Sequence, residues 1–332
     1  MPSAYDKVLE SRKELVEQVI VMMQERYNNK EAWNRGFFTP HNPLSGATYK
    51  GGNKLRLMIE GARYSDPRWM TFKQIKEAGY KLETGAKGVL CEKWIFPEQD
   101  KKETETSPVQ TDKAGAEKAT QSRVMVSYFY VFNASKVKDF PAHEMPEPLP
   151  QDKMLQLADD LIESSECEVL EEEQGQGRAY YSRSEDYIVL PPRPLFKSTE
   201  AFTGTLLHEM AHSTGHEERL NRIHGASFGD ENYAREELVA ELSTIFSAAD
   251  MKMAISEEGL QDNSDYLKSW VKVLSDNPNE LFRACVDADK ASGRIVENYR
   301  QIQEIREQEE VKDEQRQVSV ERGQKVVRAM AI

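Results

Sequence analysis

One short run of residues constrains this chain more than any other: His208-Glu209-Met210-Ala211-His212, an H-E-x-x-H pattern. Histidines four positions apart lie on one face of an α-helix about one turn apart, so we expect the run to be helical. Two imidazoles in that arrangement can hold one zinc ion, with the intervening glutamate beside the open coordination position. Ser198 or Thr199 can cap the start of this helix. The competing interpretation is a surface helix with two unrelated histidines.

A catalytic zinc ion usually has three protein ligands and a water, so a third ligand is required. Glu237 is one candidate, on a helix expected over 233–249, where Glu241 lies one turn further along the same face. One of these two carboxylates can bind zinc while the other hydrogen-bonds a ligand histidine. Glu218 is the second candidate, because it stands where H-E-x-x-H-x-x-G-x-x-H has its last histidine. His216, one turn beyond the motif, is the third.

These residues predict metal-assisted hydrolysis of a peptide bond. Zinc lowers the pKa of a bound water and polarises the scissile carbonyl. Glu209 is expected to accept the proton of that water and to pass it to the leaving amine. The strand expected at Tyr187–Leu190 precedes the metal helix, so we expect it to pair with an extended peptide substrate.

Charge is divided unevenly along the 332 residues, whose net charge is −13. Residues 1–97 hold 16 Lys and Arg against 11 Asp and Glu, a balance of +5, so the remainder carries −18. This asymmetry predicts separate tasks for the two halves. No apolar stretch approaches the roughly 20 residues of a membrane span, and the three cysteines are far apart. We therefore expect a soluble cytoplasmic protein with reduced thiols and no membrane partner.

The basic front half is rich in aromatic residues and holds three of the four tryptophans. Proteins that bind single strands combine stacking rings with a basic groove. Tyr49 and Trp69 are the expected stacking rings, and Lys50, Arg68 and Lys73 the expected phosphate contacts. In the alternative interpretation the rings form a core and the charges a solvated face.

Residues 98–122 form a low-complexity insert with almost nothing to bury, so we expect disorder there. A hairpin is expected within 81–96 and a strand over 123–133, on either side of the insert. The insert is therefore expected to be a long loop inside one sheet. A cluster of prolines at 141–150 is a better position for a domain boundary.

Two groups of segments resemble one known family. Residues 42–53 and 66–74 resemble the N-terminal domain of ArdC-type antirestriction proteins. Residues 208–216, the pair Arg219-Leu220 and residues 236–241 resemble the zincin-like metallopeptidase domain that follows it in that family. The resemblance extends from about Val8 to Tyr299.

This resemblance implies an α+β protein of two domains. Residues 1–142 would form a mixed α/β domain that binds single-stranded DNA, with Asn53 among its DNA contacts. Because the acidic second half should repel DNA, the isolated front domain is expected to bind at least as well as the full chain. Residues 143–300 would form the zincin-like metallopeptidase domain, mostly helical with a small sheet. The charged C-terminal tail at 301–332 lies outside the resemblance, and its composition predicts a solvated helix or a disordered tail. The family further implies that Glu237 is the third ligand of a gluzincin-like zinc site.

The expected function is that of a single-stranded-DNA-binding antirestriction protein with a zinc metallopeptidase domain. The family implies carriage on plasmids or other mobile elements, and protection of their incoming DNA from restriction during conjugation. The protein substrate would be a restriction subunit or a protein bound to DNA. One alternative is a non-catalytic DNA-binding protector with a structural zinc site. Another is a metal-dependent hydrolase without a DNA role.

Overall fold

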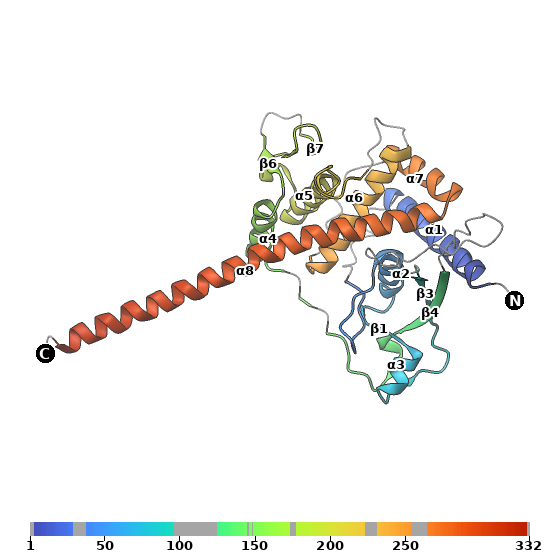
Figure 1. Ribbon diagram of the computed structural model, residues 1–332, viewed down its shortest axis with the longest axis horizontal. Coiled ribbons are helices and arrows are strands. Elements are labelled where there is room, and N and C mark those ends of the chain that lie inside the picture. The colour runs from blue at the N-terminus through green and yellow to red at the C-terminus, as the bar shows by residue number, and fades with distance from the viewer. Residues whose placement is uncertain are drawn as a thin grey trace, which may run out of the picture.

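Helices predominate in the structure, a computed structural model that describes residues 3–28, 38–95, 125–144, 146–147, 149–172, 177–222, 231–253 and 264–330. Three small sheets accompany the helices, which confirms the α+β expectation (Figure 1). The predicted insert at 98–122 lies outside the described residues.

The front half is built on a three-stranded antiparallel sheet in the order β1 (Trp69–Thr71), β4 (Met125–Asn133), β3 (Val89–Ile95). Two helices, α1 (Ala4–Asn28) and α2 (Gly51–Gly61), pack against it. Because β3 and β4 pair along seven residues, the strands on either side of the insert share one sheet, as predicted.

The hairpin predicted within 81–96 is wrong. Strand β2 (Lys81–Leu82) pairs with β5 (Val137–Lys138), so it belongs to a different sheet from β3. The chain crosses from one sheet to the other through Gly85, whose φ is +84°. Helix α3 (Phe72–Glu77), with a complete capping box at Thr71, precedes these strands, and the 3-10 turn Ala134–Lys136 links β4 to β5.

The second half opens with α4 (Gln151–Glu163) and a three-stranded sheet in the order β6 (Glu168–Glu171), β8 (Tyr187–Leu190), β7 (Tyr180–Ser182). Strand β8 is central, parallel to β6 and antiparallel to β7. Both of its edges are therefore already paired, and the prediction that Tyr187–Leu190 pairs with a substrate is wrong.

Four helices complete the second half after the 3-10 turn Arg193–Leu195. They are α5 (Thr199–Ser213), α6 (Glu231–Asp250), α7 (Ser264–Asp276) and α8 (Asn279–Met330). Helix α8 crosses the body along α6 and then extends beyond every other element (Figure 1). The segment predicted as a charged tail, 301–332, is therefore part of this helix as far as Met330.

One hydrophobic core joins the two halves. Helices α1 and α2 bury apolar side chains against α6, α7 and α8; this core includes Leu15, Val16, Val19, Leu55, Met58, Leu238, Leu242, Phe246, Trp270, Leu281 and Phe282. Lys54 of α2 is buried at the same junction, where its Nζ lies 2.9 Å from Oδ2 of Asp250 on α6. The predicted division at 142/143 thus separates segments that share a core.

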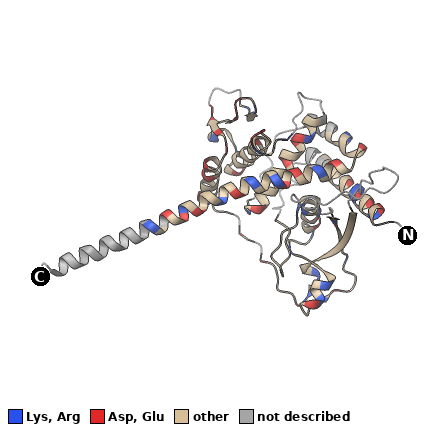
Figure 2. Ribbon diagram, in the orientation of Figure 1, with Lys and Arg blue, Asp and Glu red and all other residues tan. Residues whose placement is uncertain are grey.

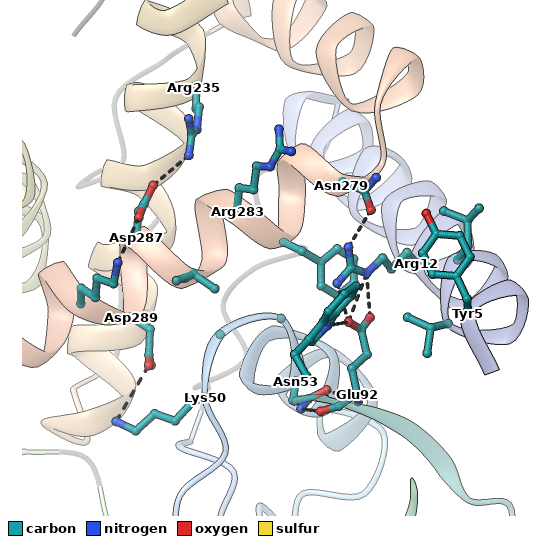
Figure 3. Close-up of a pocket in the computed structure, with 18 residues that line it drawn as sticks. Tyr5, Arg12, Lys50, Asn53, Glu92, Arg235, Asn279, Arg283, Asp287 and Asp289 are labelled. Atoms are coloured by element: carbon teal, nitrogen blue, oxygen red, sulfur yellow. Dashed lines mark hydrogen bonds and ion pairs between the residues drawn. The ribbon is translucent and has the colours of Figure 1, made fainter. Parts of the chain in front are cut away.

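A cavity of about 920 Å³ lies between the halves, lined by α1, the start of α2, β3, α6 and α8 (Figure 3). Acidic and basic residues are interspersed along the part of α8 that crosses the body (Figure 2). In the described part of the chain, no helix combines the length and apolar character needed to cross a membrane.

Candidate metal centre

Helix α5 carries the H-E-x-x-H run through the centre of the second half. The hydroxyl of Ser198 caps the helix by accepting the N–H of Ala201 at 3.2 Å, as expected for an N-cap serine. Almost every side chain of the helix is buried, between α4, β7, β8, α6 and α8. This burial fixes the helix on all sides, so the side chains of its motif are held in place.

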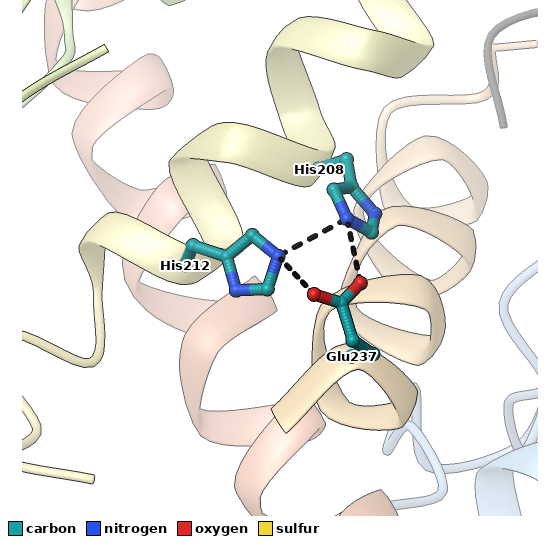
Figure 4. Close-up of side chains that lie close together, drawn as sticks. All are labelled: His208, His212 and Glu237. Carbon is teal, nitrogen blue, oxygen red and sulfur yellow. Dashed lines mark hydrogen bonds and ion pairs between the residues drawn. The ribbon is translucent and has the colours of Figure 1, made fainter. Parts of the chain in front are cut away.

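His208, His212 and Glu237 lie together where α5 passes α6 (Figure 4). The two Nε2 atoms are 3.1 Å apart. Oxygens of Glu237 lie 3.5 Å from Nε2 of His208 and 3.7 Å from Nε2 of His212. A tetrahedral ion with ligand bonds of about 2.0–2.2 Å holds its ligand atoms roughly 3.3–3.6 Å apart, so the three side chains fit a divalent metal ion.

The titratable groups of this cluster act strongly on one another. Burial alone would lower the pKa of His208, but the hydrogen bond with Glu237 and the charges of Glu241 and Glu209 outweigh it and raise that pKa to about 9. Burial opposes ionisation of Glu237 too, yet the two histidines and a hydrogen bond from Tyr233 keep its pKa below the ordinary value. The site therefore attracts positive charge, as a cation-binding site must.

Glu209 is also buried, and burial raises its pKa even though His208 and His212 act in the opposite direction. The backbone N–H of Tyr181, in β7, donates a hydrogen bond to its carboxylate. Glu209 is thus a carboxylate with a raised pKa, held between the motif helix and an edge strand. A raised pKa makes a carboxylate a stronger base.

A second carboxylate, Glu236, supports the site and was missed by the sequence analysis. Its Oε1 lies 3.4 Å from Nδ1 of His212. Arg222 donates to both of its oxygens, at 3.0 and 2.6 Å, and also to the hydroxyl of Thr214 and the carbonyl of Ala211, both at 2.7 Å. Burial would raise the pKa of Glu236, but the bonds from Arg222 and His212 lower it to about 2.

Arg222 and Glu236 therefore fix the ring of His212 from the side opposite the metal position. No spacing rule connects Arg222 with the motif, because the contact depends on how the chain turns after α5. Glu236 is adjacent to the predicted Glu237, and that adjacency is the only signal that could have drawn attention to it.

The other predicted ligands lie outside the cluster. Glu218 is exposed, and its backbone N–H donates to Nδ1 of His216 at 3.3 Å. Neither residue joins the metal-ligand cluster of the described residues. Glu241 is buried one turn from Glu237, and its charge acts on His208. Its role as an outer residue that supports a ligand histidine stays a prediction.

Two predicted DNA contacts are placed in the front core. Trp69 is fully buried, packed edge-on against Tyr64. This contradicts the prediction of a stacking ring at Trp69, because a ring must be exposed to stack on a base. Tyr49 is half-buried against the same core, and its hydroxyl donates to the carbonyl of Trp69 at 3.1 Å.

The side chains of the other four predicted DNA contacts differ in their accessibility to a ligand. The side chain of Arg68 is bound by Asp66 at 2.8 Å, and that of Asn53 exchanges hydrogen bonds with the backbone of Glu92. Lys50 and Lys73 project into solvent. Their contact with DNA stays a prediction, and the structure leaves Lys50 and Lys73 as the more accessible of the four.

Comparison with known families finds two matches in consecutive order. Residues 10–132 match the N-terminal domain of the anti-restriction factor ArdC, and residues 156–287 match a zincin-like metallopeptidase. Among curated proteins, a DNA primase TraC of Escherichia coli is 35% identical over 285 residues, which cover 84% of this chain. The chain spans only 26% of the length of that relative.

Solved structures agree with these matches. The metal-free crystal structure of the antirestriction protein ArdC from plasmid R388 is 26% identical, with a TM-score of 0.63, and covers 84% of this chain and 97% of its own. The Mn(II)-bound structure of the same protein gives a TM-score of 0.62 at 25% identity, with coverage of 84% and 96%.

Proposed function

Since this chain belongs to the ArdC family of antirestriction proteins, with an ArdC N-terminal domain and a zincin-like metallopeptidase domain, we propose that it binds single-stranded DNA and cleaves a protein with the help of a zinc ion. The observation that carries the peptidase half is the convergence of His208, His212 and Glu237 beside the buried Glu209. The Mn(II)-bound structure of the ArdC of R388 supports the binding of a divalent ion.

Three protein ligands favour catalysis over a structural role, because structural zinc sites usually have four. A bound zinc ion supplies a polarised carbonyl and an acidified water. Glu209 accepts the proton of the attacking water and delivers it to the leaving amine. Its raised pKa makes it a stronger base toward that water than an ordinary carboxylate.

The edge strand β7 is the surface that best fits an extended peptide. Its neighbour β8 is paired on both sides, whereas in the described sheet β7 has one partner only. The N–H of Tyr181 in β7 reaches Glu209, so a peptide added to this edge passes the general base. The turn after β7 is braced by Arg219, which binds Asp186 and donates to the hydroxyl of Tyr181 at 3.0 Å.

We further propose that the substrate is a restriction subunit or another protein bound to DNA, and that cleavage protects mobile-element DNA as it enters a cell. The family's antirestriction role and the plasmid origin of the R388 protein support this proposal. The shared core also supports it, because it holds the DNA-binding half and the peptidase half together in one structure.

Glu209→Gln tests the peptidase. The variant should keep metal and fold, because the residue acts on water and is not a ligand, but lose all cleavage of an unstructured protein such as casein, assayed with zinc and single-stranded DNA. Glu218→Gln is the matched control, since it makes the same change on an exposed residue after the same helix. Equal turnover in Glu209→Gln and wild type would remove Glu209 from the mechanism.

A further inference from the structure

The cavity between the two halves is separate from the metal centre. None of His208, His212 and Glu237 lines it. Its walls come from both halves: α1, the first turn of α2 and β3 on one side, and α6 and α8 on the other (Figure 3). Its volume of about 920 Å³ lies in the range of about 300–1,000 Å³ typical of ligand pockets.

The charges at its rim favour a phosphate-bearing ligand. Three cations line it and project into solvent, with side-chain exposures of 70% for Lys50 and 61% each for Arg283 and Lys290. Their acidic partners are recessed, with side-chain exposures of 15% for Asp289, 17% for Glu280 and 26% for Asp287. The acids thus hold the cations from below, and an anion that approaches the rim meets the cations first.

An exposed aromatic ring accompanies these cations. Trp94 of β3 is 36% exposed and is held by its indole N–H, which donates to Oε2 of Glu92 at 2.9 Å. The guanidinium of Arg12 lies 5.0 Å from the centre of the Trp94 ring and is itself fixed by Glu92 and Asn279. The ring is therefore positioned in advance of any ligand, as a stacking platform for a base should be.

We propose that this cavity binds a segment of single-stranded DNA, with a base stacked on Trp94 and phosphates near Lys50, Arg283 and Lys290. The proposal rests on the proposed function in that it assumes affinity for single strands, and it assigns where they bind. Two of the three cations belong to α8, so the DNA site includes the peptidase half. Duplex DNA is excluded as the preferred ligand, because its base faces are covered by neighbouring pairs.

The test measures fluorescence anisotropy of a labelled oligothymidylate with the full chain at low salt. Trp94→Ala should weaken binding by about 5- to 150-fold, the range expected for one stacked base, and Trp94→Phe should retain most of the affinity. Lys290→Glu should weaken binding and reduce the slope of log affinity on log salt by about 0.7, the value for one phosphate contact on a single strand.

Lys312→Glu is the matched control for Lys290→Glu, because it reverses the same charge on an exposed part of α8 outside the cavity. Lys73→Glu tests the surface of α3 as the competing site. Thermal unfolding of each variant shows that the fold is kept.

The outcomes distinguish failure of the proposed cavity site from failure of single-strand binding itself. Losses confined to Trp94→Ala and Lys290→Glu support the cavity. If wild type binds and these two variants bind as tightly as Lys312→Glu, the site is wrong while DNA binding stands. If Lys73→Glu alone loses affinity, the strand lies on α3. If wild type shows no affinity for the oligothymidylate at low salt, the DNA part of the proposed function fails, and this inference fails with it.

Discussion

Replacing Arg222 with leucine should destabilise the protein, because the buried carboxylate of Glu236 then loses its partner. Arg222 and Glu236 are both buried and joined by two hydrogen bonds, at 3.0 and 2.6 Å. Removal of one partner of such a pair costs about 3–5 kcal/mol, because the other charge stays buried without compensation. Arg222 and His212 together, against the effect of burial, lower the pKa of Glu236 from 4.5 to about 2, which corresponds to a net stabilisation of about 3 kcal/mol.

The pH dependence of this effect has a defined sign. Since the pKa of Glu236 is lowered in the folded protein, its contribution is fully present above pH 4.5 and is lost as the pH falls toward 2. Without Arg222, burial raises the pKa of Glu236 in the variant, so the free-energy difference between wild type and Arg222→Leu should be largest at high pH and should shrink as the pH falls through that raised pKa toward 2. A difference that grows in acid would refute the role of Glu236.

Urea unfolding in the presence of a chelator measures the effect without a contribution from metal. Arg222→Leu combined with Glu236→Gln should be more stable than Arg222→Leu alone, because no charge is then left buried. Arg183→Leu is the control: Arg183 donates to the carbonyls of Gly215 and Arg222, so its loss should cost only about 1 kcal/mol per bond. If Arg222→Leu unfolds like wild type, or if the double variant is the least stable, the reasoning is wrong.

Three further predictions concern metal and domain independence. Glu237→Ala should lose the metal that Glu218→Ala keeps, as measured by mass spectrometry of the purified proteins. Loss of metal in Glu218→Ala alone would make Glu218 the third ligand in place of Glu237. Chelation should lower the melting temperature of wild type, by the equivalent of about 2.7 kcal/mol of lost stabilisation if free metal is 100 times its Kd, and should leave His208→Ala unchanged. The fragment 1–142 should not melt cooperatively, because it exposes Leu15 and the other α1 and α2 residues that α6–α8 cover; a cooperative circular-dichroism transition would contradict this.

The metal cluster could be predicted because it depends on local geometry. The spacing of His208 and His212 fixes their shared helix face, and the two glutamates at 237 and 241 fix a second face on the next helix. The sheet that spans the insert was predictable for a similar reason, since strong strand patterns flank it on both sides. In each instance the pattern lies within a single helix or strand, although the elements themselves are far apart in the sequence.

The errors arose where long-range packing decides. Trp69 and Trp94 are both aromatic residues among cations, but only the assembled fold buries the first and exposes the second. The hairpin prediction failed at Gly88 because the residues after it pair with β4, and a Cβ at that glycine would lie 3.0 Å from the ring of Phe132. The contact of Arg222 with Glu236 likewise depends on a turn that no periodicity describes.

The core that joins α1 and α2 to α6, α7 and α8 also limits how this protein can recombine with its relatives. A crossover between the two matched regions would pair one parent's α1 and α2 with the other parent's α6–α8. Such a hybrid keeps the cluster of His208, His212 and Glu237, yet it mixes two sets of side chains that fill a single interior. Its success depends on whether the volumes of Leu15, Leu55, Phe246 and Phe282 match their new neighbours. We therefore expect the two halves to be inherited together, as one unit.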